Sequence, residues 1–159
     1  MKVNRREFFG RTIKGVAVIA LPGILSSVLE SCSNNSNPVN PADVSSLQTV
    51  NATSQNGTIS LKIDSSSPLS KTGSAAMVQF QNGIILVDHP SGNSFNALSS
   101  ICTHQGCTIT QYDANKQDFV CPCHGSVFSA TGQVVKGPAG SPLSSYQTQY
   151  SNGTLAIKV

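Results

Sequence analysis

The chain beyond residue 47 shows short alternations of hydrophobic and polar side chains instead of long helical stripes. Residues 58–63, TISLKI, alternate strictly between polar and aliphatic, which predicts a strand with one exposed and one buried face. After Cys32, no window of ten or more residues carries a convincing helical pattern. We therefore expect an all-β domain, a small antiparallel β sandwich or barrel with loops gathered at one end.

Turn residues divide this region into short segments, each of which predicts a strand. Asn82-Gly83 and Asn152-Gly153 lie between strand-like runs, as type I′ hairpin turns require. The predicted strands cover residues 46–50, 58–64, 75–81, 83–88, 95–99, 118–121, 127–128, 133–135, 146–150 and 154–159.

The N-terminal segment has a different character. Arg5 and Arg6, in NRREFFG, precede an apolar run at residues 16–25 and resemble a twin-arginine export signal. The run extends over about ten to fourteen residues, whereas a membrane helix needs about 20, so a signal peptide fits it better. We expect the protein to be exported and anchored to the membrane on its extracytoplasmic, periplasmic side.

Cys32 is the odd cysteine of the chain, and Leu29-Glu30-Ser31-Cys32 resembles a lipoprotein processing site. Glu30 departs from the small residue that is usual there, so an uncleaved membrane helix and a plain secreted form stay open as alternatives. Residues 33–46 are rich in Asn, Ser and Pro and predict a flexible tether. The expected organisation is a signal segment at 1–31, a lipid-anchored tether at 32–46 and a folded domain at 47–159.

The net charge of the chain is concentrated in its N-terminal segment. The formal net charge is +3, but residues 1–31 hold five of the ten Lys and Arg and two of the seven acids. The remainder has five Lys and five Asp and is neutral, which argues against a nucleic-acid surface.

Four of the five cysteines and two of the three histidines lie in two short boxes, with sixteen residues between His104 and Cys121. We call residues 102–107 box 1 and residues 121–126 box 2. Two Cys and two His suit a metal centre, and one further cysteine in each box could form a disulfide. Zinc accepts Cys2His2 ligation, but it leaves the additional cysteine of each box without a role. The boxes are Cys102-x-His104-x-x-Cys107 and Cys121-x-Cys123-His124.

CTHQGC in box 1 and CPCHGS in box 2 resemble the two boxes of the Rieske proteins of cytochrome bc complexes. The resemblance covers about residues 75–159 and implies a Rieske β domain with one [2Fe-2S] cluster. It also implies a disulfide between Cys107 and Cys123. The cluster ligands that it implies are Cys102, His104, Cys121 and His124.

The resemblance assigns roles to four neighbouring residues. Ser126 matches a serine that donates to a cluster sulfide, and Pro138 lies in a GPAGSPL loop similar to the family's proline loop. Phe128 stands where high-potential members carry a tyrosine, and Gln105 stands where a leucine is common. His89, outside both boxes, is expected at the surface.

The ligand types indicate one-electron transfer. Two ferric ions, two sulfides, two thiolates and two neutral imidazoles sum to zero charge, which favours reduction at roughly −150 to +300 mV. The second ring nitrogen of each imidazole can titrate, so reduction is expected to couple to a proton. We expect a subunit of a quinol-oxidising cytochrome bc-like complex rather than a stand-alone enzyme. The alternatives are a subunit of an exported molybdenum oxidoreductase and a redox-sensing lipoprotein. Quinol is a candidate substrate, and no nucleic acid is expected.

Overall fold

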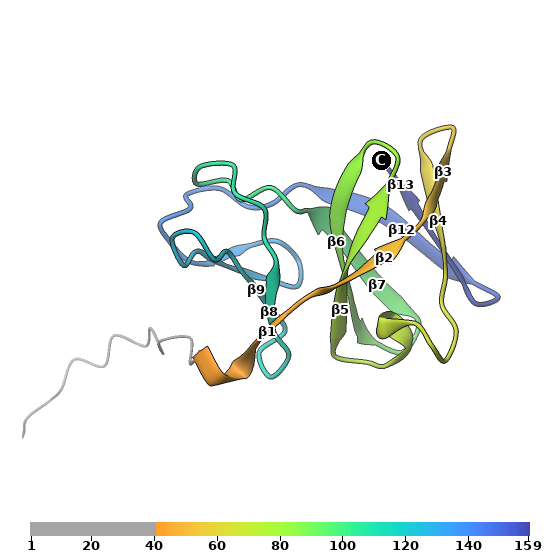
Figure 1. Cartoon of the computed structure of the whole chain (residues 1–159), viewed down its shortest axis with the longest axis horizontal. Helices are drawn as coiled ribbons and strands as arrows, with labels where there is room; N and C mark the ends of the chain where they lie inside the picture. The colour runs from red at the N-terminus through yellow and green to blue at the C-terminus, as the bar shows by residue number, and fades with distance from the viewer. Residues whose placement is uncertain (1–40) are drawn as a thin grey trace, which may run out of the picture. The chain divides into compact units, whose positions relative to one another are not determined.

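The computed structural model describes residues 41–159, which form thirteen strands and two short 3₁₀ turns. The predictions for Arg5, Arg6 and Cys32 lie outside the described residues. Within residues 41–159, no helix has the length and apolar character that crossing a membrane requires. The strands belong to two sheets, which lie side by side in Figure 1.

The large sheet has eight strands in the order β2-β5-β6-β7-β12-β13-β4-β3. Neighbouring strands in this sheet pair antiparallel, except β2 and β5, which pair parallel. β2 and β3 stand at opposite ends of this order but are separated in sequence only by Ala52, so the sheet nearly closes into a barrel. Its strands are β2 (Gln48–Asn51), β3 (Thr53–Gln55), β4 (Thr58–Lys62), β5 (Ser74–Phe80), β6 (Gly83–Ser91), β7 (Ser94–Ser99), β12 (Ser145–Ser151) and β13 (Thr154–Lys158).

The small sheet has five strands in the order β1-β8-β9-β10-β11. Box 1 lies between β7 and β8, and box 2 is the loop between β9 and β10, so this sheet carries both boxes. Its strands are β1 (Val44–Ser46), β8 (Gln111–Asp113), β9 (Asp118–Val120), β10 (Val127–Ser129) and β11 (Val134–Lys136).

One segment joins the two sheets at the start of the domain. β1 pairs with β8 of the small sheet, and β2 pairs with β5 of the large sheet. Leu47 between them is buried, and its N–H donates to the Thr110 carbonyl at 2.8 Å. β1 includes the last three residues of the segment predicted as a tether, because a ladder with β8 satisfies its backbone groups.

Two hydrophobic cores hold the fold. The large sheet encloses one core, to which β4 contributes Ile59 and Leu61, as its alternation predicted. A second core lies between the sheets and contains Cys102 and Cys121 together with side chains of both sheets. The free cysteines of the boxes are therefore part of the packing that holds the small sheet on the large one.

All ten predicted strand segments contain strand residues, and the all-β prediction is confirmed. Asn152 and Gly153 adopt φ of 48° and 74°, as a type I′ turn requires. The β5–β6 hairpin differs, because its loop is Gln81-Asn82 and Gly83 already pairs with Phe80. Our pattern missed β3, β8 and the turn at Asn56-Gly57, where φ is 50° and 73°.

The surface prediction for His89 is wrong: its side chain is 6% exposed. Its Nδ1 lies 2.9 Å from the Leu69 carbonyl oxygen and its Nε2 2.6 Å from that of Gly92. A carbonyl oxygen only accepts, so both hydrogen bonds form only when both ring nitrogens carry a proton. The ring also stacks on Phe95 at 4.3 Å between centroids. His89 thus ties a 3₁₀ turn and a hairpin loop to β6.

We expect His89→Phe to lower the free energy of unfolding by roughly 1–3 kcal/mol, because an aromatic ring remains but the buried Leu69 carbonyl and the Gly92 carbonyl lose their imidazole partner. Urea unfolding of the two proteins measures the change. Tyr150→Phe, which keeps the ring beside Phe95 and removes only a hydroxyl, should cost less. An unchanged midpoint in His89→Phe would mean that neither carbonyl depends on the imidazole.

Candidate functional site

The two boxes share one backbone arrangement. In box 1 the Cys102 N–H donates to the Cys107 carbonyl at 2.8 Å, and the Gly106 N–H donates to the Cys102 carbonyl at 2.9 Å. Gly106 has φ of +75°, in the left-handed region that glycine adopts without steric cost. The chain therefore turns back on itself around the cysteine at the first position of the box.

Box 2 repeats this pattern position by position. Here the Cys121 N–H donates to the Ser126 carbonyl at 2.8 Å, and the Gly125 N–H donates to the Cys121 carbonyl at 3.0 Å. Gly125 has φ of +73°. Cys102 and Cys121 consequently occupy equivalent places at the start of two equivalent turns.

Cys102 and Cys121 are free thiols and are only 2% and 1% exposed. Burial raises the pKa of the Cys121 thiol, and the neighbouring Cys102 side chain raises it further. The two sulfurs are thus close enough to influence one another. A cysteine binds a metal ion as a thiolate, so metal binding would displace protons from this pair.

The two imidazoles of the boxes also meet. His104 and His124 stand edge to face, with ring centroids 4.8 Å apart and an angle of 85° between the planes. His104 Nδ1 is buried and has no hydrogen-bond partner among residues 41–159, whereas His124 is exposed. A buried ring nitrogen without a partner is costly unless a ligand satisfies it. This orphaned nitrogen fits a metal at the site.

The donor set also fits a binuclear centre. Within the described residues, no three His, Cys, Asp or Glu side chains gather closely enough to hold one metal ion. A [2Fe-2S] cluster asks for less at each iron, namely two thiolates at one and two imidazoles at the other. Two neighbouring thiols and two neighbouring imidazoles supply those two pairs.

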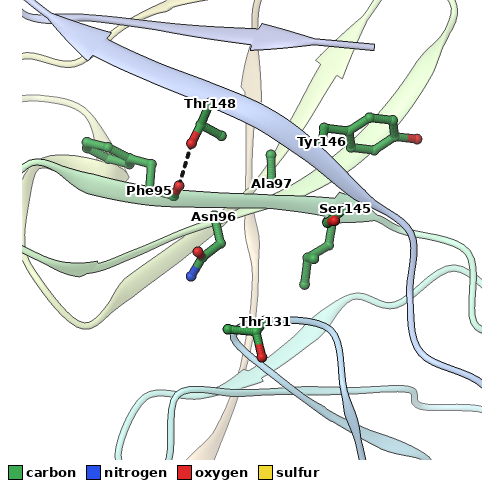
Figure 2. Close-up of a pocket in the computed structure, with 8 residues that line it drawn as sticks. Phe95, Asn96, Ala97, Thr131, Ser145, Tyr146 and Thr148 are labelled. Atoms are coloured by element: carbon green, nitrogen blue, oxygen red, sulfur yellow. Dashed lines mark hydrogen bonds between the residues drawn. The ribbon is translucent and has the colours of Figure 1, made fainter.

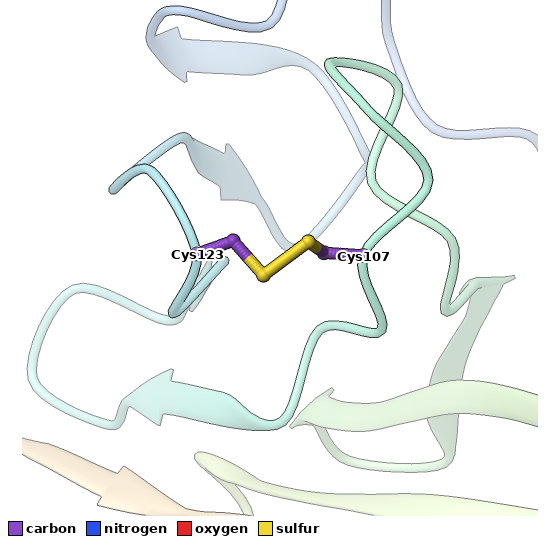
Figure 3. Close-up of a disulfide and its surroundings, with 2 residues drawn as sticks. All are labelled: Cys107 and Cys123. Atoms are coloured by element: carbon purple, nitrogen blue, oxygen red, sulfur yellow. A yellow bond between two sulfur atoms is a disulfide. The ribbon is translucent and has the colours of Figure 1, made fainter.

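The predicted disulfide is confirmed: Cys107 and Cys123 are bonded, with their Cα atoms 6.5 Å apart (Figure 3). The bond joins the last residue of box 1 to the third residue of box 2. It closes a loop with fifteen intervening residues and holds the two turns against each other.

A third loop, residues 137–143, is hydrogen-bonded to both boxes. Thr103 Oγ1 donates to the Ser141 carbonyl at 2.6 Å, and the Ala139 N–H donates to Ser126 Oγ at 3.0 Å. Ser126 is fully buried and accepts here, which leaves its own hydroxyl proton free to donate elsewhere. We did not predict the role of Thr103, because its partner is 38 residues away and nothing local indicates it.

The other three residues singled out in the sequence lie in different surroundings. Phe128 is fully buried on β10 and packs in the core that contains Cys102 and Cys121. Gln105 and Pro138 are exposed, one in box 1 and one in the third loop. Of these three, only Phe128 belongs to the packing around the cysteines.

A cavity of about 280 Å³ lies elsewhere, between β7, β12 and the turn at Thr131 (Figure 2). Thr148 Oγ1 spans β12 and β7 beside it by donating to the Phe95 carbonyl at 2.7 Å. No lining residue belongs to either box. The cavity therefore has no part in the candidate metal centre.

Comparison with known proteins points to one family. The profile of the Rieske [2Fe-2S] domain matches residues 60–147, more than half of the chain. The chain is 34% identical over 85 residues to a cytochrome b6-f complex iron-sulfur subunit of Chlorobaculum thiosulfatiphilum, covering 54% of this chain and 46% of that protein. It is 32% identical over 113 residues to a subunit of the same name in Prochlorococcus marinus (strain MIT 9215), covering 64% and 63%.

The first of these matches spans less than half of the relative's length. Among solved structures, naphthalene 1,2-dioxygenase shares the fold, with a TM-score of 0.51 and 18% identity. That match covers 62% of this chain and 25% of the dioxygenase.

We expect Thr103→Val to loosen the third loop, since the isosteric side chain cannot donate to the Ser141 carbonyl. Loss of one hydrogen bond worth about 1 kcal/mol should speed amide exchange in residues 137–143 roughly fivefold. Hydrogen exchange followed by mass spectrometry measures this. Thr108→Val, at an exposed threonine just after box 1, is the matched control and should leave the loop unchanged. Equal exchange rates of residues 137–143 in both variants would mean that the Thr103–Ser141 hydrogen bond does not hold the third loop.

Proposed function

Because the chain belongs to the Rieske [2Fe-2S] domain family, we propose that it is an electron-transfer protein whose cluster is held by Cys102, His104, Cys121 and His124. When bound, the [2Fe-2S] cluster accepts and releases one electron. The observation that carries the assignment is the meeting of two buried free thiols and two imidazoles, one with an orphaned nitrogen, across two disulfide-linked turns.

The four side chains divide the work by their exposure. Cys102 and Cys121 are buried in the core and keep water from the thiolate side. His124 is exposed, so its ring can contact a redox partner or a quinol and can exchange a proton at its free nitrogen. This asymmetry supports proton-linked electron transfer through the imidazole side.

We place the protein in a membrane-bound complex of the cytochrome b/c type. The support is the identity of 32–34% to cytochrome b6-f complex iron-sulfur subunits of two organisms. Export through Arg5 and Arg6 and lipid attachment at Cys32 would hold the domain on the extracytoplasmic side, where the Cys107–Cys123 disulfide is stable.

The purified full-length protein should contain about two irons and two acid-labile sulfides per chain. Cys102→Ala should abolish both, because a thiolate ligand is lost. Cys32→Ser, which removes a cysteine outside the boxes, is the control and should keep them. Iron, sulfide and zinc analysis with visible absorption makes the measurement. Stoichiometric zinc without visible absorption would refute the assignment.

A further inference from the structure

A buried carboxyl group lies where the two sheets meet. Asp88 is on β6, two residues from Leu86 and therefore on the same face of the strand. Leu86 packs in the core between the sheets together with Tyr112 of β8 and Phe119 of β9. The Asp88 side chain is fully buried on this face, and no step of the proposed electron transfer uses it.

The contacts of Asp88 do not balance a negative charge. Its Oδ2 accepts one long hydrogen bond, 3.3 Å, from Asn96 Nδ2 on β7. Its Oδ1 is buried and has no hydrogen-bond partner among the described residues. Asp113 differs, because its Oδ1 accepts from the backbone N–H groups of Asn115 and Lys116 at 3.0 and 3.2 Å.

The small sheet also buries three titratable side chains. Tyr112, Asp113 and Asp118 of the small sheet are all buried, and the Tyr112 hydroxyl has no hydrogen-bond partner there. Burial raises the pKa of Tyr112, and the negative charges of Asp88, Asp118 and Asp113 raise it further. The Tyr112 hydroxyl is thus within electrostatic reach of all three carboxyl groups.

The nearby cations do little for Asp88. Lys116 Nζ is 3.9 Å from Asp113 Oδ2. His89 follows Asp88 in sequence and points to the opposite face of β6, where it bonds to two carbonyls. Burial raises the pKa of Asp88 to about 7, against smaller lowering by the Asn96 hydrogen bond and by His89.

Water has a route to the joint between the sheets. A crevice of about 520 Å³ opens between the segment joining β1 to β2 and the loop at residues 65–74. Leu47, Ala75 and Tyr112 line it, and Ala75 is the β5 neighbour of Asp88 in the ladder. A charge on Asp88 could be hydrated from this crevice only if the small sheet moved.

We propose that Asp88 is a proton-binding site at the joint between the sheets, and that release of its proton loosens the small sheet, with both boxes, from the large one. With the proton bound, the carboxyl is neutral and its burial in the shared core is tolerated. Without it, an unpaired charge is buried in the shared core, within electrostatic reach of the Tyr112 hydroxyl. The site therefore couples pH to the packing of the sheet that carries the boxes.

The pKa of Asp88 determines how the stability of the folded protein changes with pH. The pKa of Asp88 is raised from 3.8 in the open chain to about 7 in the folded protein. Between these values the folded protein binds more protons, so stability falls as pH rises and levels off above about pH 7. From pH 5 to pH 8 the opening equilibrium of the small sheet should rise about a hundredfold.

Infrared spectroscopy of the cluster-loaded protein with ¹³C-carboxyl-labelled aspartate tests the proton directly. We expect a protonated carboxyl band at pH 6 that disappears with a midpoint near pH 7. Asp88→Asn should lack this band. If every aspartate of the wild-type protein were ionised at pH 6, the proton-binding site would be refuted even if the variant failed to fold.

Hydrogen exchange on the same full-length protein tests the loosening. After correction for intrinsic rates, amides of β8 and β9 should lose protection from pH 5 to pH 8, while those of β4 in the large sheet should not. Asp88→Asn, a neutral isostere, should remove the pH dependence. Asp64→Asn, at an exposed residue, is the matched control and should retain it. Equal pH dependence of amide exchange in wild type and Asp88→Asn would overturn the coupling. The cluster assignment would still stand in that case, because iron content tests it separately.

Discussion

The bond between Cys107 and Cys123 fixes the approach of two loops, each of which is closed by its own short hydrogen bonds. Closing a loop of this length removes chain entropy worth about 3 kcal/mol from the unfolded state. Its larger consequence is geometric, because each turn presents one thiol and one imidazole, and neither turn alone offers a complete ligand set. The third loop adds one hydrogen bond to each box and so depends on the same alignment.

The two sheets have different roles: the large sheet supports the fold, and the small sheet carries the two boxes. The nearly closed large sheet has a core of its own, whereas the small sheet packs through a core that also contains the free cysteines. Any change in how the sheets meet therefore acts on the surroundings of the candidate ligands. The segment from β1 to β2 and the buried carboxyl of Asp88 both lie at this joint, so packing and protonation act at the same place.

Much of this was predictable from local sequence. Two boxes with fixed spacing indicated the metal centre, and the alternation at residues 58–63 indicated a half-buried strand, because both signals are contained within a few residues. Features that depend on distant partners were not predictable. In the sequence His89 is only a polar residue before a proline. It is buried because carbonyls of a 3₁₀ turn and of a hairpin loop lie within hydrogen-bond distance of its ring. Thr103 likewise acquires its role from Ser141, which only the folded chain brings near.

The assignment of the cluster site requires that His104 and His124 both bind the same iron-sulfur centre. Pulsed electron paramagnetic resonance of the reduced protein, with ¹⁵N incorporated only into histidine, tests it most directly, since nitrogen bound to the paramagnetic centre gives resolved couplings. We predict couplings to two histidine nitrogens, one of which disappears in His104→Ser or His124→Ser if a centre is retained. A spectrum without strongly coupled histidine nitrogen, from protein that contains two irons per chain, would contradict this assignment.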